Sequence, residues 1–157
     1  MRINKKLLIV CIAVPLLVGG LAALLTQDSM STFAALNQPP LSPPGWLFPI
    51  VWTILYILMG ISSYLILQSG ADEQEVGKAI SIYVYQLIVN FLWPTFFFNL
   101  GWYLFSLLWL LLLWVMVLIM IIRFYNISKT AGYLQIPYLV WLTFAAYLNL
   151  GVWLLNA

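Results

Sequence analysis

Aromatic and amide side chains recur at helical spacing in three apolar segments of this 157-residue chain. In segment 79–100 the steps are four, three and four, which places Gln86, Asn90, Trp93 and Phe97 on one helix face. Segments 46–67 and 134–155 have comparable faces, formed by Pro49, Trp52, Tyr56, Gly60 and Ser63 and by Trp141, Ala145, Leu148 and Val152. Turned inward, these faces would line an aromatic, uncharged cavity suited to a large, flat, apolar ligand.

The same residues also have purely structural uses. Tryptophan often lies in interfacial belts of membrane proteins, and amides often bond a neighbouring helix. Trp52, Trp93 and Trp141 lie about two turns or more inside their segments, which favours a pocket lining over a belt. For Gln86 and Asn90, bonding between helices and contact with a ligand both stay open.

The usual residues of acid–base catalysis are missing from the apolar segments. The chain has no histidine, and its carboxylates Asp28, Asp72, Glu73 and Glu75 all lie between those segments. Cys11 is the only cysteine, so no Cys/His nucleophile or zinc-type ligand set can form. We expect no metal site, no required cofactor, no conventional catalytic residue and no nucleic-acid partner.

Composition places the chain in a lipid bilayer. Hydrophobic residues make up 65% of it and charged residues 6%, with a mean hydropathy of +1.06, whereas soluble domains carry about 25% charge. Five apolar segments are each near the ~20 residues that cross a bilayer as a helix. The sequence predicts an all-α membrane protein, a five-transmembrane-helix bundle forming one domain over residues 1–157, with spans at about 7–26, 46–67, 79–100, 102–122 and 134–155.

The six cations indicate the orientation of the bundle. With five spans, all six fall on one side, which the positive-inside rule makes cytoplasmic. The N-terminus is therefore expected inside and the C-terminus outside. The connection 27–45 then faces outward, and proline stiffens it, because this residue fixes its own φ and restricts its predecessor. We expect this loop to be a lid over the cavity.

The chain resembles the TspO/MBR family of tryptophan-rich sensory and translocator proteins through nearly its whole length. The motifs that carry the resemblance are Pro39, Pro43-Pro44 and Trp46; Pro49, Trp52, Leu55-Tyr56 and Met59-Gly60; Gln86, Asn90, Trp93-Pro94 and Phe97; and Pro137-Tyr138, Trp141, Phe144-Ala145, Leu148-Asn149 and Trp153. The resemblance implies a five-helix bundle, commonly dimeric, that binds porphyrins such as protoporphyrin IX and haem. It also suggests a bacterial cytoplasmic membrane as the location.

By this resemblance Trp52 and Trp141 would flank the ligand. The rest of the ligand-binding set would be Ala23, Pro49, Tyr56, Asn90, Trp93, Phe97, Ala145 and Leu148, and the lid set Pro39, Pro43, Pro44 and Trp46. Metal-free porphyrin fits better than haem, because no histidine is available for the iron. The chain departs from the family at Leu41 and Ser42, so lid contacts to a ligand do not carry over, and no Lys or Arg follows Tyr147 to complete a sterol motif.

Three functions are consistent with these residues. The first is a membrane receptor or carrier that binds porphyrins for sensing or transport. The second is an enzyme that degrades porphyrin in light, with Trp52 and Trp141 as the reactive aromatic groups. The third is a structural subunit of a larger membrane complex that binds no ligand.

Overall fold

The structure, a computed structural model, describes residues 2–157, and its regular elements are helices. In chain order these are α1 (Lys5–Leu25), α2 (Ser29–Ala35), α3 (Leu47–Leu67), α4 (Glu73–Pro94), the π-helical turn η1 (Thr95–Asn99), α5 (Tyr103–Ile127), α6 (Lys129–Leu134) and α7 (Ile136–Asn156). Five stretches within the described residues are long and apolar enough to cross a membrane. The predicted all-α, five-span bundle is confirmed.

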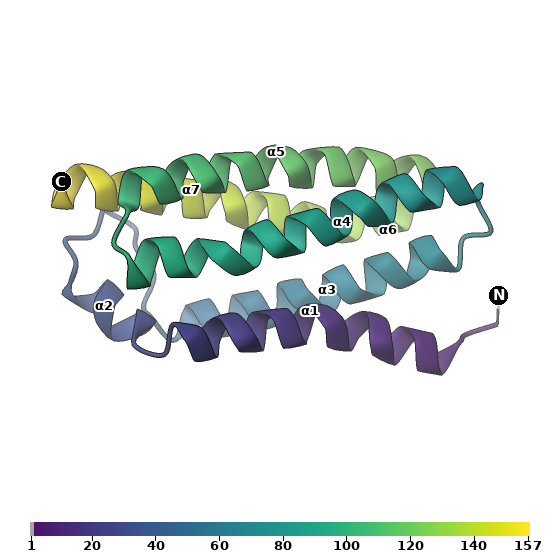
Figure 1. Ribbon diagram of the computed structural model, residues 1–157, viewed down its shortest axis with the longest axis horizontal. Coiled ribbons are helices and arrows are strands. Elements are labelled where there is room, and N and C mark those ends of the chain that lie inside the picture. Colours follow the sequence, from purple (N-terminus) through teal and green to yellow (C-terminus); the bar gives the residue numbers. More distant parts are fainter. Residues whose placement is uncertain (1) are drawn as a thin grey trace.

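The long helices form two groups. Helix α1 lies along α3, while α5 packs against both α4 and α7, and α6 packs against α3 and α5 (Figure 1). The six cations lie at the end of the bundle that carries the N-terminus, which we call the basic end. Helix α2 and the C-terminus lie at the opposite end, which we call the loop end.

Apolar side chains fill the space between the helices and also cover the outside. Met59, Ile66, Val117, Met120 and Phe124 are completely buried in one core cluster. Large apolar side chains on the outer faces, such as those of Leu17, Leu21 and Leu108, are more than half exposed. An apolar exterior of this kind is stable only in contact with lipid, which agrees with five membrane spans.

The helices extend beyond the apolar segments that predicted them. Helix α4 begins at Glu73 instead of near 79, and α5 continues to Ile127 instead of ending near 122. Glu73 and Glu75 occupy the first turn of α4, where acidic groups interact favourably with the helix dipole. Most of the predicted connection between the last two spans is also helical, as the end of α5 and as α6. Hydropathy marks the part of a helix that lies in lipid, whereas the backbone hydrogen bonds of the helix continue beyond that part.

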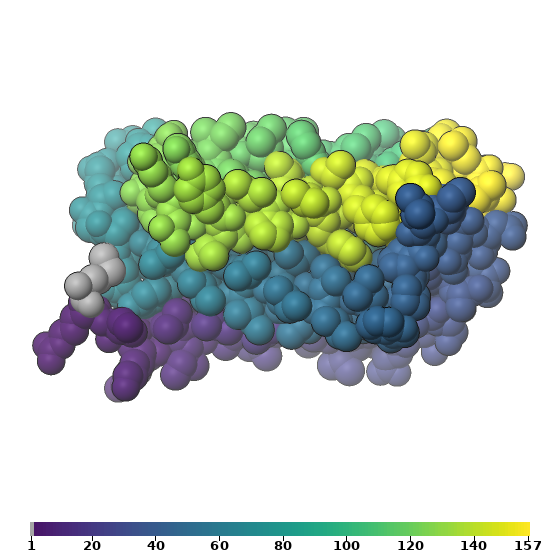
Figure 2. All heavy atoms as spheres, turned by 180° about the vertical axis from the view of Figure 1, so that it is seen from behind, coloured from purple at the N-terminus to yellow at the C-terminus, as the bar shows by residue number. Residues whose placement is uncertain are grey.

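The predicted lid loop 27–45 is fastened to the last turns of α7. The Asn37 N–H donates to Asn156 Oδ1 at 3.1 Å, and Asn156 Nδ2 donates to the Asn37 carbonyl at 2.8 Å. The Tyr147 hydroxyl donates to the Pro40 carbonyl at 2.5 Å. Figure 2 shows this loop, in blue, against the yellow end of α7. The loop is therefore held by specific bonds in addition to its prolines.

Candidate functional site

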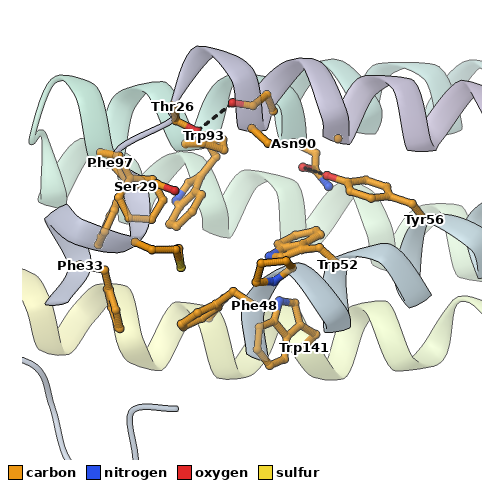
Figure 3. A pocket seen from close by; sticks show the side chains of 18 of the residues that line it. Thr26, Ser29, Phe33, Phe48, Trp52, Tyr56, Asn90, Trp93, Phe97 and Trp141 are labelled. Atoms are coloured by element: carbon orange, nitrogen blue, oxygen red, sulfur yellow. Dashed lines mark hydrogen bonds between the residues drawn. The ribbon is translucent and has the colours of Figure 1, made fainter. Parts of the chain in front are cut away.

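A cavity of about 360 Å³ lies among the helices toward the loop end (Figure 3). Side chains from α1, α2, α3, α4, η1, α5 and α7 line it. All ten residues predicted to bind a ligand are among them: Ala23, Pro49, Trp52, Tyr56, Asn90, Trp93, Phe97, Trp141, Ala145 and Leu148. The aromatic faces of three separate spans thus meet around one space.

Aromatic rings form two walls of this cavity. On one side, Trp52 stacks on Tyr56 with ring centroids 5.6 Å apart, and Phe48 meets Trp141 edge-on at 5.8 Å. On the other side, Trp93 stacks on Phe97 at 4.9 Å and an interplanar angle of 21°. The π-helical turn that follows Pro94 carries Phe97 inward, where it is almost fully buried. These ring faces and edges offer a flat ligand contact from both sides.

A series of hydrogen bonds leads from the cavity into the bundle. The Tyr56 hydroxyl donates to Asn90 Oδ1 at 3.1 Å, Asn90 Nδ2 donates to the Tyr138 oxygen at 2.6 Å, and the Tyr138 hydroxyl donates to Gln86 Oε1 at 2.7 Å. Gln86 is completely buried and does not line the cavity, so its amide bonds between helices. Asn90 bonds between helices and lines the cavity as well.

The indole N–H groups near the cavity differ in their bonding. Trp93 Nε1 donates to Asn149 Oδ1 at 3.1 Å, and Asn149 Nδ2 donates to the Tyr103 carbonyl at 2.9 Å, which ties α4, α5 and α7 together. Trp141 Nε1 is buried and has no partner among residues 2–157. A buried indole N–H normally finds an acceptor. Trp141 therefore presents a free donor beside the cavity.

The cavity is uncharged. None of the described residues that line it is Asp, Glu, Lys or Arg, and its polar groups are hydroxyls, amides and indoles. Within the same part of the chain there is no group of three His, Cys, Asp or Glu side chains that could hold a metal ion. This arrangement can hold an apolar ring system by stacking and a few directed hydrogen bonds. It offers no charged group for proton transfer.

The predicted lid residues Pro39, Pro43, Pro44 and Trp46 do not line the cavity. Pro39 is buried against Gly151 of α7, and Trp46 is 67% exposed. Helix α2, which forms part of the loop 27–45, lines the cavity instead, through Ser29, Met30 and Phe33. This short helix was not predicted from the sequence; its available signal was the pair Met30 and Phe33, two apolar residues three apart in an otherwise small and polar stretch. The cavity residues of α5, Leu110 and Leu113, were not predicted either, because they lie in a uniformly apolar segment without any distinguishing face.

Comparison with known proteins agrees with this architecture. The model of the TspO/MBR family matches residues 11–154, a range that contains every residue lining the cavity. The chain belongs to the TspO/MBR family. It is 36% identical over 156 residues to the tryptophan-rich protein TspO of Chlorobaculum tepidum, covering 98% of this chain and 99% of the relative. It is 37% identical over 155 residues to that of Archaeoglobus fulgidus, with the same coverage.

The similarity extends to animal members of the TspO/MBR family. The translocator protein of Bos taurus is 35% identical over 144 residues, which is 88% of this chain and 83% of the relative. The family match over residues 11–154 takes in most or all of each span, the loop 27–45 and the cavity. With five apolar helices, it establishes a multi-pass integral membrane protein.

Proposed function

We propose that this TspO/MBR family member is a membrane receptor or carrier that binds porphyrins, with protoporphyrin IX as the representative ligand. The observation that carries the proposal is the cavity itself, in which Trp52 and Trp141 from two different spans face one uncharged space. Its volume of about 360 Å³ is within the ~300–1,000 Å³ common for small-molecule sites. A flat macrocycle matches walls made of aromatic rings.

The polar groups suggest how the porphyrin is oriented. No cation lines the cavity to neutralise propionate groups, and burying an unpaired carboxylate is costly. The propionates therefore point toward the loop end, where the Thr26 and Ser29 side chains line the cavity. The Trp141 N–H, which has no partner in the described chain, donates to an acceptor on the ligand.

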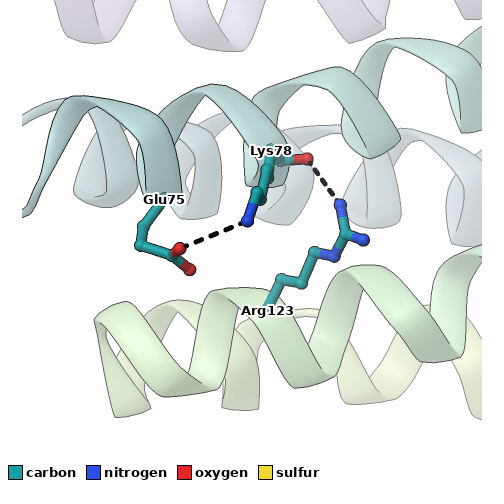
Figure 4. Close-up of polar contacts among 3 residues, drawn as sticks. All are labelled: Glu75, Lys78 and Arg123. Atoms are coloured by element: carbon teal, nitrogen blue, oxygen red, sulfur yellow. Dashed lines mark hydrogen bonds and ion pairs between the residues drawn. The ribbon is translucent and has the colours of Figure 1, made fainter.

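The proposal includes an orientation in a bacterial cytoplasmic membrane, with the N-terminus inside and the C-terminus outside. Its support is the grouping of the cations at the basic end, where Arg123 Nη1 donates to the Lys78 carbonyl at 3.2 Å and Lys78 lies 3.6 Å from Glu75 (Figure 4). Cysteine-accessibility labelling at each end tests the orientation. The family resemblance also implies a homodimer, which light scattering of the detergent-solubilised protein tests through its mass.

Titration of the purified protein with protoporphyrin IX in the dark, followed by the porphyrin absorbance band, tests the binding. We expect saturable binding that weakens on the order of tenfold or more when Trp52→Phe and Trp141→Phe are combined, because both stacking surfaces shrink from an indole to a phenyl ring and the Trp141 donor is lost. The matched control is Trp102→Phe, an exposed indole that does not line the cavity. Absence of saturation, or an unchanged affinity in the double variant, refutes the proposal.

The same complex under illumination tests the alternative functions. A new bilin-like absorbance that requires both oxygen and the two cavity indoles would assign a light-dependent degradation reaction. Stable porphyrin under light would leave binding alone. A complete lack of any ligand-induced thermal shift would favour a structural subunit.

A further inference from the structure

Two cations lie at the same level of the basic end, in the space between the packed helices α4 and α5. The Arg123 side chain reaches across from α5, and its Nη1 donates to the Lys78 carbonyl of α4 at 3.2 Å. Figure 4 shows the Lys78 ammonium and the Arg123 guanidinium between the two helices. Both residues are exposed. Two positive charges are thus accessible at one point of the seam between α4 and α5.

These cations keep most of their capacity to bind an anion. A guanidinium has five N–H donors, and the Lys78 carbonyl accepts from one of those on Arg123. Among residues 2–157, no carboxylate lies within ion-pair distance of Arg123, and Lys78 lies 3.6 Å from Glu75 in an exposed pair that contributes little. The planar, forked donors of arginine match the oxygens of a phosphate group.

The helix faces that carry these cations also meet deeper in the membrane. Trp109 Nε1 of α5 donates to the Val89 carbonyl of α4 at 2.7 Å. Trp109 precedes Arg123 by 14 residues and Val89 follows Lys78 by 11, which is close to four and three helical turns. The seam therefore runs along α4 and α5 from the two cations to this bond.

Exposed apolar side chains flank the seam between these two points. Ile119 and Leu112 precede Arg123 by four and eleven residues, and Tyr85 follows Lys78 by seven, so each lies near the face of its cation. All three are exposed on the outside of the bundle. Leu112 lies roughly 16 Å along α5 from Arg123, which is about half of the ~30 Å hydrocarbon thickness. This strip has the length of an acyl chain in one leaflet.

We propose that the α4–α5 seam at the basic end binds an anionic phospholipid. The headgroup phosphate accepts hydrogen bonds from Arg123 and Lys78, and an acyl chain lies along Leu112, Ile119 and Tyr85. Basic pockets between membrane spans are suited to anionic headgroups, whereas a zwitterionic headgroup would bring its own cation toward these two. None of the five residues lines the cavity, so the site is separate from the proposed porphyrin site and does not depend on it.

Thermal unfolding of the full chain in a mild detergent tests the lipid class. We expect phosphatidylglycerol to raise the melting temperature in a saturable manner, because a ligand bound to the folded state stabilises it. Phosphatidylcholine with the same acyl chains and soluble glycerol phosphate should have no effect at the same concentrations. An equal rise with phosphatidylcholine shows that the headgroup charge is not recognised, and an equal rise with glycerol phosphate shows that the acyl chain is not. Either result, or no rise with phosphatidylglycerol, overturns the proposal.

Charge-removing variants test the location of the site, with affinity taken from the midpoint of the phosphatidylglycerol titration. Arg123→Gln and Lys78→Gln should each weaken binding about fivefold. The matched control is Lys6→Gln, which removes an exposed cation of α1 at the same end of the bundle and should change the affinity less than about twofold. An equal loss in all three variants indicates diffuse attraction to the basic end and contradicts a site at the α4–α5 seam.

The carboxylate of Glu75 provides a test in the opposite direction. It lies beside Lys78 and would repel a phosphate bound there. Glu75→Gln should therefore strengthen phosphatidylglycerol binding about two- to fivefold. An unchanged or weaker affinity means that no phosphate lies beside this side chain, and the proposal fails.

Discussion

The contact between α1 and α3 depends on the absence of a side chain at Gly60. A Cβ at this position would lie 2.5 Å from the Ile12 Cα and 2.6 Å from the Cys11 carbonyl oxygen, both backbone atoms of α1. Backbone cannot rotate away as a flexible side chain can. In Gly60→Ala, therefore, the two helices must separate until that 2.5 Å distance reaches at least 3.4 Å, the beginning of ordinary van der Waals contact.

The expected cost follows from this geometry. Overpacking a close contact costs about 1–3 kcal/mol, while replacing glycine by alanine within a helix returns up to about 1 kcal/mol. Because the clash is with backbone atoms, the cost lies in the upper part of that range, about 2–3 kcal/mol. The net loss is then about 1–2 kcal/mol, which lowers the melting temperature by roughly 2–8 °C in a protein of this size. The separation also moves α1 away from the cavity wall, where Gly19 lies directly against the Tyr56 ring. Porphyrin affinity should fall together with stability.

Thermal unfolding in one detergent, with and without porphyrin, measures both effects. The matched control is Gly77→Ala, because a Cβ at Gly77 of α4 meets nothing within 4 Å and this residue does not line the cavity. Gly77→Ala should be neutral or slightly stabilising, since only the helix-propensity gain remains. If Gly60→Ala melts at the same temperature as Gly77→Ala, close helix packing at Gly60 does not hold this bundle together.

Three further substitutions test other parts of the structure. Tyr138→Phe leaves the groups bonded to its hydroxyl unpaired and should destabilise by about 1–3 kcal/mol in thermal unfolding, whereas Tyr85→Phe, on a side chain 61% exposed to lipid, should have no effect. Gly151→Ala places a Cβ into Pro39, so hydrogen exchange in residues 29–45 should accelerate while α5 stays unchanged; an unaltered loop would argue against its attachment to α7. Glu75→Gln removes an exposed ion pair with Lys78 and should leave the melting temperature unchanged, because such pairs contribute little.

Much of the cavity lining could be predicted from the sequence because its residues follow helical periodicity. Trp52 and Tyr56 lie one turn apart, as do Asn90 and Trp93, so each pair shares a face whatever the helix contacts. Periodicity does not predict which helix faces pack against each other. Trp93 and Asn149, 56 residues apart, bond across two helices, and only the assembled bundle reveals that pair.

The part of the loop that lines the cavity could not be predicted from the sequence. The prolines correctly mark a constrained loop, yet α2 contributes Phe33 to the cavity while Pro39 packs against α7. Local conformational preference determines how a proline constrains the backbone of the loop. It does not determine which part of the protein the loop packs against, because the contacting residues can lie more than 100 positions away, as Tyr147 does from Pro40.

The sequence by itself determined that the chain crosses a membrane five times, carries no charge within its five apolar segments and places aromatic residues on single helix faces. These properties are local, since a window of about 20 residues decides whether a helix is stable in lipid. Only the tertiary structure decided that Gln86 bonds across helices, that Trp141 keeps a free N–H, and that α2 closes the cavity. Each of these features depends on which residues, distant in the sequence, pack against the side chain and whether one of them offers it a hydrogen-bond partner. The packing of the whole bundle determines both.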